Sequence, residues 1–319
     1  MNSVITGTGK CLPTTILTND ELTRMVDTSD EWITRMTGIK ERRIIDAGKT
    51  SVDLASSAAL SALEASGLSA KKIDLIIVAT ISNEKRFGSC ACDVQARIGA
   101  SNACATDTGA GCTGFLSGLD TANAFIQSGK HKNALVIGVE VLSRITDYTD
   151  RGTCILFGDG AGAVILESSE GNHGILASRI FSDGSKGNLL YCEKTSDGKE
   201  FLRMDGNTVF KHAVRNMIKS SRLVMNEANL EMKDIGLLIP HQANERIIRT
   251  IAERIGIPPE KVFMNIAKYG NMSSATIPIA ITEALEEDRI KTDDILLLTA
   301  FGAGLTWGST IVRWGLGRY

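Results

Sequence analysis

The feature that most constrains the fold is that the chain repeats itself. LSAKKIDLIIVATIS, which begins at Leu68, resembles LEMKDIGLLIPHQA, which begins 162 residues later at Leu230. NALVIGVE resembles DILLLTAFG, which begins 161 residues later. A third pair, GAVIL at 162–166 and STIVR at 309–313, follows in the same order at a shorter displacement. A single match of apolar strands would be ordinary, but three in order indicate an internal duplication.

Each copy alternates helix and strand patterns. SVDLASSAALSALEAS at 51–66 has apolar residues at helical spacing behind a serine that can cap a helix. DLIIVATIS at 74–82 is a continuous apolar run, typical of a strand buried on both faces. Two such copies would pack with helices between two sheets. We therefore expect an α/β protein with halves at 1–169 and 170–319, an insert near 141–156 in the first half, and a functional site where the halves meet.

The composition excludes several functional classes. A net charge of −2 and 43% hydrophobic residues are ordinary for a globular protein and do not predict a nucleic-acid binder. The start MNSVITGTGKCLP lacks a signal-peptide pattern, and no apolar run reaches the roughly 18 residues of a membrane span. The seven cysteines show no C-x-x-C pair and no zinc-site spacing. We therefore expect a soluble cytoplasmic protein with free thiols and no structural metal.

Cys112 is the first candidate for chemistry. It lies in GAGCTGF, and the apolar spacing that follows predicts a helix ending near Gly129. The unpaired N–H groups and dipole at a helix N-terminus favour a thiolate, so we predict a lowered pKa for this cysteine. Gly109, Gly111 and Gly114 would allow a sharp bend that presents the sulfur. The alternative is a buried structural cysteine, which is the commoner state of a free thiol.

Two polar residues of the second copy complete a candidate site. His241 directly follows the apolar run GLLIP, and in the register of the repeat it is opposite Ala79. Asn271 lies in YGNMSSATIP, the segment opposite the Cys112 loop. Matching loops of a duplicated fold meet where the copies meet, which would bring these residues together. Taken singly, a histidine at a strand end and an asparagine after a glycine are more often structural.

Six segments together closely resemble the β-ketoacyl-acyl-carrier-protein synthase III family: DTSDEWITRMTGIKERR (27–43), GAGCTGF (109–115), DRGTCILFGDGAGAV (150–164), IPHQANERI (239–247), KYGNMSSATIP (268–278) and FGAGLTWGS (301–309). The resemblance runs in order over essentially the whole chain. It implies a thiolase-like, duplicated α-β-α-β-α five-layer sandwich and a homodimer. It also implies an acyltransferase that initiates fatty-acid synthesis.

By that resemblance Cys112 accepts an acyl group from acyl-CoA as a thioester. A malonyl group on acyl carrier protein then loses carbon dioxide and attacks this thioester to give a 3-oxoacyl product, with no metal or organic cofactor. His241 and Asn271 would donate hydrogen bonds to the malonyl thioester oxygen. The backbone N–H groups of Cys112 and of the turn at Ala303 would form an oxyanion hole.

The resemblance also assigns contacts to the coenzyme. Trp32 and Arg151 would sandwich the adenine, a role that suits a flat indole and a guanidinium group. Phe87 would reach across the dimer to bound the acyl pocket. Further residues would line the pantetheine tunnel: Thr28, Gly152 and Asn244.

A basic stripe is the candidate docking surface for the carrier protein. Lys211, Arg215 and Lys219 repeat at helical spacing, and Arg246 and Arg249 follow the histidine. Local positive charge on a chain of net charge −2 could dock an acidic carrier. The alternative is a solvated helix face, and the resemblance favours docking, especially for Lys211 and Arg246.

Three positions depart from the family pattern. Met36 stands where an arginine is usual, with Arg35 displaced by one residue, and Gly88 replaces the proline of a usual Phe-Pro pair. Ala303 replaces a common glycine. These departures leave room for a relative in secondary metabolism that transfers its acyl group to another acceptor.

Other relatives are distinguished by residues that the chain has or lacks. Thiolases place a second reactive cysteine in the C-terminal half, whereas no cysteine follows Cys192. The elongating synthases use two histidines where this chain offers His241 and Asn271. A non-catalytic partner that only packs against an active subunit would normally lack the nucleophile, so Cys112 counts against that alternative.

Overall fold

Two sheets with matching strand orders form the framework of the computed structural model, which describes residues 2–85 and 87–315. The first sheet has the order β1 (Asn2–Cys11), β7 (Asp159–Ser169), β6 (Asn133–Val141), β4 (Leu75–Ala79) and β5 (Cys104–Thr108). The second has the order β8 (Gly174–Ser182), β13 (Thr306–Arg313), β12 (Ile295–Gly302) and β11 (Ile235–Pro240).

The strand directions repeat as well as the order. In each sheet the first two pairings are antiparallel and the third is parallel. β5 then lies parallel to β4, and the corresponding place beside β11 is taken by a parallel bridge between Leu238 and Val262. The two sheets are therefore built on one plan, as expected for an internal duplication.

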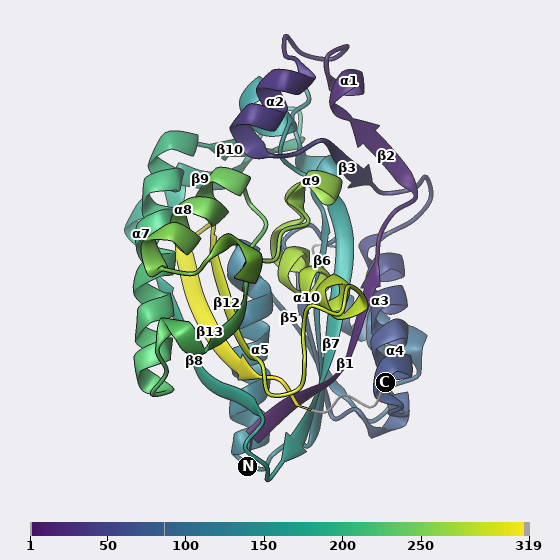
Figure 1. The fold of residues 1–319 in the computed structure, drawn as a ribbon. Helices are drawn as coiled ribbons and strands as arrows, with labels where there is room; N and C mark the ends of the chain where they lie inside the picture. Colours follow the sequence, from purple (N-terminus) through teal and green to yellow (C-terminus); the bar gives the residue numbers. More distant parts are fainter. Residues whose placement is uncertain (1, 86, 316–319) are drawn as a thin grey trace.

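Helices form three further layers around the sheets (Figure 1). The first sheet is covered on its outer face by α3 (Ser51–Ser66) and α4 (Cys90–Ile98). The second sheet is covered on its outer face by α7 (Gly206–Glu227), against which α8 (Glu245–Ile255) packs. Between the sheets lie α5 (Gly114–Gln127) and α10 (Thr276–Glu286). The duplicated α-β-α-β-α sandwich predicted from the sequence is confirmed.

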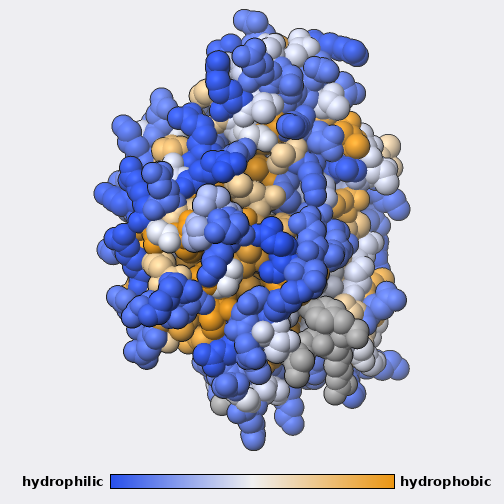
Figure 2. All heavy atoms as spheres, viewed as in Figure 1, coloured by the Kyte–Doolittle hydropathy of each residue, from blue (hydrophilic) through white to orange (hydrophobic). Residues whose placement is uncertain are grey.

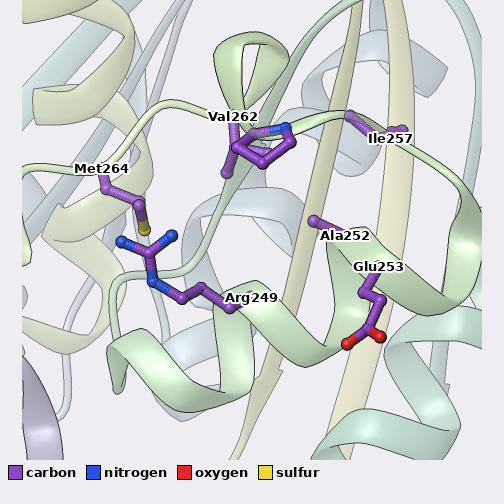
Figure 3. A pocket seen from close by; sticks show the side chains of 7 residues that line it. Arg249, Ala252, Glu253, Ile257, Val262 and Met264 are labelled. Carbon is purple, nitrogen blue, oxygen red and sulfur yellow. The ribbon is translucent and has the colours of Figure 1, made fainter.

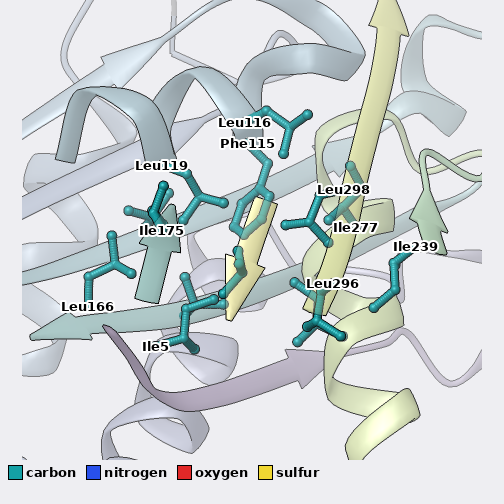
Figure 4. Close-up of a cluster of buried hydrophobic side chains, with 14 of the residues drawn as sticks. Ile5, Phe115, Leu116, Leu119, Leu166, Ile175, Ile239, Ile277, Leu296 and Leu298 are labelled. Atoms are coloured by element: carbon teal, nitrogen blue, oxygen red, sulfur yellow. The ribbon is translucent and has the colours of Figure 1, made fainter. Parts of the chain in front are cut away.

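The middle layer holds the core that the two halves share. Phe115 and Leu119 of α5 and Ile277 of α10 are fully or almost fully buried against strands of both sheets. Figure 4 shows these side chains between Leu166 of the first sheet and Leu298 of the second. The division predicted at 169/170 falls in the connection between β7 and β8. Because the core is common to both sides of that division, the two halves pack as one body.

The predicted elements can be compared with the observed ones residue by residue. The helix expected at 51–66 is α3 with the same bounds, but its N-cap is Thr50, which forms a capping box with Asp53, rather than a serine. Gly67 ends the helix in the left-handed conformation at φ +66°. The insert expected near 141–156 contains a 3₁₀ turn, η3 (Leu142–Ile145), and the short helix α6 (Arg151–Cys154).

Smaller elements cover one end of the sandwich. They are the antiparallel pair of β2 (Thr15–Thr18) and β3 (Glu41–Ile44), the hairpin of β9 (Leu190–Lys194) and β10 (Glu200–Met204), and the helices α1 (Asn19–Leu22), α2 (Asp30–Thr37) and α9 (Ile266–Tyr269). The face of this end that Figure 2 shows is mostly hydrophilic. Within residues 2–85 and 87–315, no helix combines the length and the apolar character needed to cross a bilayer.

Candidate active site

Cys112 lies at a close approach of the two halves. It is in the 3₁₀ turn η2 (Gly111–Thr113), which leads directly into α5, as the sequence predicted. A Cβ atom at Gly302, the last residue of β12, would lie only 2.6 Å from the Cys112 nitrogen, so this approach requires glycine. Thr306 Oγ1 donates to Ala110 O at 3.1 Å and holds the next turn of the second half against the same loop.

The turn expected to complete the oxyanion hole is also at this seam. A Cβ atom at Gly111 would lie 3.2 Å from the Ala303 nitrogen, and Gly111 itself has φ +53°. The turns that carry the Cys112 and Ala303 N–H groups are therefore neighbours. The Ala303 methyl group lies on the side facing Gly111 and fills space that a glycine at this position would leave empty.

The predicted lowering of the Cys112 pKa is wrong. Burial raises the pKa of its thiol to about 12, and the carboxyl group of Glu140 adds to the rise, while the Ser273 hydroxyl and the Cys112 backbone N–H act in the opposite direction. The loss of water thus outweighs the effect of the helix end, and the resting thiol is neutral near pH 7. Cys112 still keeps part of its surface accessible, so a reactant can touch it.

His241 follows β11 directly and is 98% buried, since only 2% of its surface is exposed. Its backbone N–H donates to Thr299 O at 2.8 Å, and its Nδ1 lies 2.6 Å from Thr276 Oγ1. Its Nε2 has no hydrogen-bond partner among the described residues. Burial lowers the pKa of the imidazole to about 3, so the ring is neutral. A neutral ring with one free nitrogen can accept or donate a proton there.

Asn271 is held by its backbone in a loop after α9. Its N–H donates to Leu156 O at 2.8 Å, and its carbonyl accepts from Gly158 N at 3.0 Å. Its Oδ1 accepts from Ser273 N at 2.8 Å. Because a backbone N–H can only donate, this contact identifies the oxygen of the side-chain amide and leaves the Nδ2 group available as a donor.

The 3₁₀ turn η7 (Ser273–Ala275) joins the three candidate catalytic residues. It packs against η2, and the Ser273 side chain lies beside the Cys112 thiol. Ser273 N binds Asn271, and Thr276, the first residue of α10, binds His241. The structure therefore brings Cys112, His241 and Asn271 around a single turn, although 129 to 159 residues separate the cysteine from the other two along the chain.

The residues assigned to adenine lie together at the covered end. Arg151 of α6 lies over the Trp32 ring of α2, with its guanidinium carbon 4.9 Å from the ring centroid. Arg151 Nη1 also donates to Asp27 O at 3.1 Å. Thr28, the next residue, has a buried hydroxyl without a partner among the residues that the structure describes. Gly152 N donates to Asp150 Oδ1 at 2.8 Å, and this contact makes Asp150 the N-cap of α6.

Asn244 connects this end of the molecule to the histidine segment. Its Nδ2 donates to Met36 O at 3.0 Å, and its Oδ1 accepts from Arg246 N at 2.8 Å as the N-cap of α8. Met36, the departure from the family pattern, thus contributes its backbone carbonyl here, while Arg35 is exposed. The oxygen and the nitrogen of the Asn244 side-chain amide therefore each contact a backbone group of the protein.

The basic stripe is on the exposed faces of two helices that pack together. Lys211, Arg215 and Lys219 of α7 are exposed. Arg246 of α8 lies over the Phe210 ring at 5.8 Å, which links the two helices. Arg249 is paired with Glu245 at 2.6 Å, so it offers less free charge than the others.

A pocket of about 300 Å³ opens along α8 beside Arg249 of this stripe (Figure 3). It is lined by Arg249, Ala252, Glu253, Ile257, Pro259, Val262 and Met264. None of these residues belongs to the group gathered around η7. The pocket is therefore separate from the candidate site.

Sequence reasoning overlooked Glu140. It lies in β6 with no exposed surface, and its Oε1 is 3.1 Å from Ser274 Oγ. An available signal was the single acidic residue inside the apolar run ALVIGVEVL, because a charged residue in a doubly covered strand is seldom without a role.

The chain is similar to known proteins over nearly its whole length. A family model described as 3-oxoacyl-[acyl-carrier-protein (ACP)] synthase III matches residues 106–184, and the model of its C-terminal part matches 225–314. The β-ketoacyl-[acyl-carrier-protein] synthase III of Aquifex aeolicus is 50% identical over 314 residues, covering 98% of this chain and all of that protein.

Two crystal structures show the same fold. The 3-oxoacyl-[acyl-carrier-protein] synthase III of Aquifex aeolicus VF5 matches with a TM-score of 0.95 at 50% identity, covering 98% of this chain and 100% of that one. The corresponding protein of Pseudomonas aeruginosa PAO1 matches with a TM-score of 0.95 at 39% identity over the full length of both chains.

Proposed function

The chain belongs to the β-ketoacyl-acyl-carrier-protein synthase III family, and from this membership we propose how its residues carry out the reaction. It is an acyltransferase and a condensing enzyme of fatty-acid biosynthesis. The identity to several synthases of this name favours that activity over transfer to an acceptor of secondary metabolism. The proposed substrates are a short acyl-CoA and malonyl-acyl carrier protein.

In the first step Cys112 Sγ attacks the acyl-CoA carbonyl. A thiol with a pKa near 12 must lose its proton as it attacks, and His241 Nε2 is the neutral, unpartnered group suited to take it. The N–H groups of Cys112 and Ala303 stabilise the tetrahedral oxyanion. CoA then leaves with the proton from His241, and the acyl group remains on Cys112 as a thioester.

In the second step His241 and Asn271 act as donors. Malonyl-acyl carrier protein loses carbon dioxide, and the negative charge of the resulting enolate is stabilised by Nε2–H and Nδ2–H. The enolate carbon attacks the acyl thioester, and Cys112 leaves as a thiolate that takes up one proton. Thr276 supports both histidine tautomers, because its hydroxyl can accept from Nδ1–H while donating to Ser273 O at 2.9 Å, or can donate to Nδ1.

Coenzyme binding is proposed at the Trp32 and Arg151 pair, with Thr28, Gly152 and Asn244 beside the pantetheine. The separation of 4.9 Å between the Arg151 guanidinium carbon and the Trp32 ring leaves no room for a third flat group, so Arg151 must swing out before an adenine can enter. Carrier docking is proposed at Lys211, with Arg215, Arg246 and Arg249 extending the positive surface, since acidic carriers are steered to basic patches.

A homodimer is proposed through the edge of the first sheet. β5 is the last strand of that sheet, and its residues are partly or fully exposed, so its outer edge can pair with a second copy. Phe87 is 99% exposed, which suits a side chain that is covered by a partner and bounds the partner's acyl pocket. The proposed chemistry calls for no metal or organic cofactor, and a cytoplasmic location stays a prediction.

The observation that carries the proposal is the gathering of Cys112, His241 and Asn271 around η7. Incubation with radiolabelled acetyl-CoA tests it, followed by addition of malonyl-acyl carrier protein. Label should attach to the wild type and then move to the carrier, and Cys112→Ala should take up none. Asn271→Ala should load but fail to condense, whereas His241→Ala should load slowly, because the base for the Cys112 thiol is lost, and should also fail to condense. Equal loss of loading in all three variants would contradict the assigned roles.

A further inference from the structure

Glu140 is a buried acid that the proposed mechanism does not use. It lies at the end of β6 with no exposed surface. Its Oε2 accepts from Ser82 Oγ at 2.5 Å, Ile81 N at 3.2 Å and Thr80 Oγ1 at 3.4 Å. Its Oε1 is 3.1 Å from Ser274 Oγ. These neighbours come from the loop after β4 and from η7, so the acid is at the seam of the two halves.

The surroundings of Glu140 contain no cation among the contacts that the structure describes. The groups from the β4 loop and from η7 are uncharged. On β7 the nearest acid, Asp159, is bound to Ser143 and to the backbone of Ile45. From η2 the titratable neighbour is the Cys112 thiol. Burial therefore dominates and raises the pKa of Glu140 to about 7.

The hydrogen-bond count around Ser274 indicates where the proton is. Ser274 Oγ has one hydrogen and two neighbouring acceptors, Ala79 O at 2.8 Å and Glu140 Oε1 at 3.1 Å. If the hydrogen goes to the nearer carbonyl, the contact with Glu140 is a hydrogen bond only when the carboxyl group donates. A protonated Glu140 satisfies both contacts, whereas an ionised one leaves the Ala79 carbonyl without this donor.

Ser273 brings the acid close to the nucleophile. Its hydroxyl favours the ionised forms of both Glu140 and Cys112, so it lies between them. Ser273 holds this place with a left-handed backbone, at φ +45°, which is strained for a residue other than glycine. Its Oγ has no well-aligned hydrogen-bond partner among residues 2–85 and 87–315. A proton relay from Cys112 to Glu140 is therefore not formed in this structure.

We propose that Glu140 is a protonated positioning residue, whose neutral carboxyl group keeps a second negative charge away from Cys112 while the thiolate forms. The inference rests on the proposed function, because it takes Cys112 as the nucleophile. Ionisation of Glu140 would oppose the thiolate, since a like charge nearby disfavours a second anion. As the pH rises, the thiolate fraction of Cys112 would then increase less steeply than that of an isolated cysteine.

The test is the pH dependence of Cys112 alkylation by iodoacetamide, with the modified cysteine identified by peptide mass spectrometry. This readout needs neither acyl-CoA nor carrier protein. Glu140→Gln imitates the protonated carboxyl group at every pH. The variant should be alkylated at the wild-type rate at pH 6 and about tenfold faster than the wild type at pH 8.5. At pH 8.5 the ionised Glu140 of the wild type is expected to raise the pKa of the Cys112 thiol by about one unit, and the variant lacks this charge. Glu167→Gln, the same change on β7, is the matched control and should follow the wild type.

The outcomes separate the competing interpretations. Equal rates for Glu140→Gln and wild type at pH 8.5 would overturn the proposal. A slower variant at every pH would also overturn it and would identify Glu140 as the base for Cys112. Wild-type protein gives a second check if the variant does not fold, because the logarithm of its rate should rise by less than one per pH unit between about 6 and 8. A slope of one throughout would contradict the proposal, whereas failure to load acetyl-CoA would contradict the proposed function.

Discussion

The substitution of Asn271 by Asp separates the two roles of one side chain, which are to hold η7 and to donate a hydrogen bond to the enolate. The Asn271 Oδ1 accepts from Ser273 N at 2.8 Å and helps to hold η7, while Nδ2 is the proposed donor to the enolate. Aspartate keeps an acceptor for Ser273 N but places an oxygen where the donor was. Loss of one such donor raises a barrier by about 2.7–4 kcal/mol, which is about 10²–10³ in rate. Condensation by Asn271→Asp should therefore fall by at least this factor.

Alanine at the same position gives the comparison. Asn271→Ala removes both the donor and the hydrogen bond from Ser273 N. It should therefore lower the condensation rate and also reduce the free energy of unfolding by about 0.5–1.5 kcal/mol. The release of CoA on mixing with acyl-CoA alone, followed by thiol detection, measures the first step. The amplitude of this burst should equal that of the wild type for the aspartate variant, although the added negative charge near Cys112 slows its rate. Condensation within tenfold of wild type in Asn271→Asp would refute the donor role, and loss of its CoA burst would refute the division of labour.

Three further predictions follow from named contacts. Trp32→Ala removes one face of the adenine site and should raise KM for acyl-CoA about tenfold with little change in kcat. Steady-state kinetics at varied acyl-CoA concentration measures both constants, and an unchanged KM would place the adenine elsewhere. Lys211→Glu combined with Arg246→Glu should raise KM for the carrier protein and reduce the salt dependence of that KM, with acyl-CoA loading unchanged; an equal salt dependence would reject this docking surface. Because the folded pKa of Glu140 is about 7 against an ordinary 4.5, its contribution to stability is present below pH 4.5 and is lost as pH rises to 7. The melting temperature of the wild type relative to Glu140→Gln should therefore fall across this window, and a constant difference would show that Glu140 is not protonated.

The fold could be predicted to a large extent because its repeat is written in apolar runs. The matched runs NALVIGVE and DILLLTAFG are both strands in the structure, as part of β6 and, from Ile295 on, as β12. The expected 74–82 strand is shorter in the structure, at Leu75–Ala79, because its last residues turn to bind Glu140. Thr50 rather than a serine caps α3, a choice between adjacent hydroxyl residues that helical spacing alone does not make.

The site could be predicted in its residues but not in its electrostatics. The family segments identified Cys112, His241 and Asn271, and the structure gathers them around η7. The pKa of Cys112 was predicted in the wrong direction, because a helix end is visible in sequence whereas the burial that opposes it depends on the packing of the other half. Glu140 was missed for the same reason, since its neighbours Ser82 and Ser274 are far from it in sequence.

The most direct measurement is a crystal structure of the protein with an acetyl group on Cys112. We expect His241 Nε2 and Asn271 Nδ2 to point at one common position beside the acetylated sulfur, within hydrogen-bond distance of where the malonyl thioester oxygen would bind. The N–H groups of Cys112 and Ala303 should point at the acetyl oxygen. A structure in which the two side chains point away from each other, or in which the acetyl group is on another cysteine, would contradict the account.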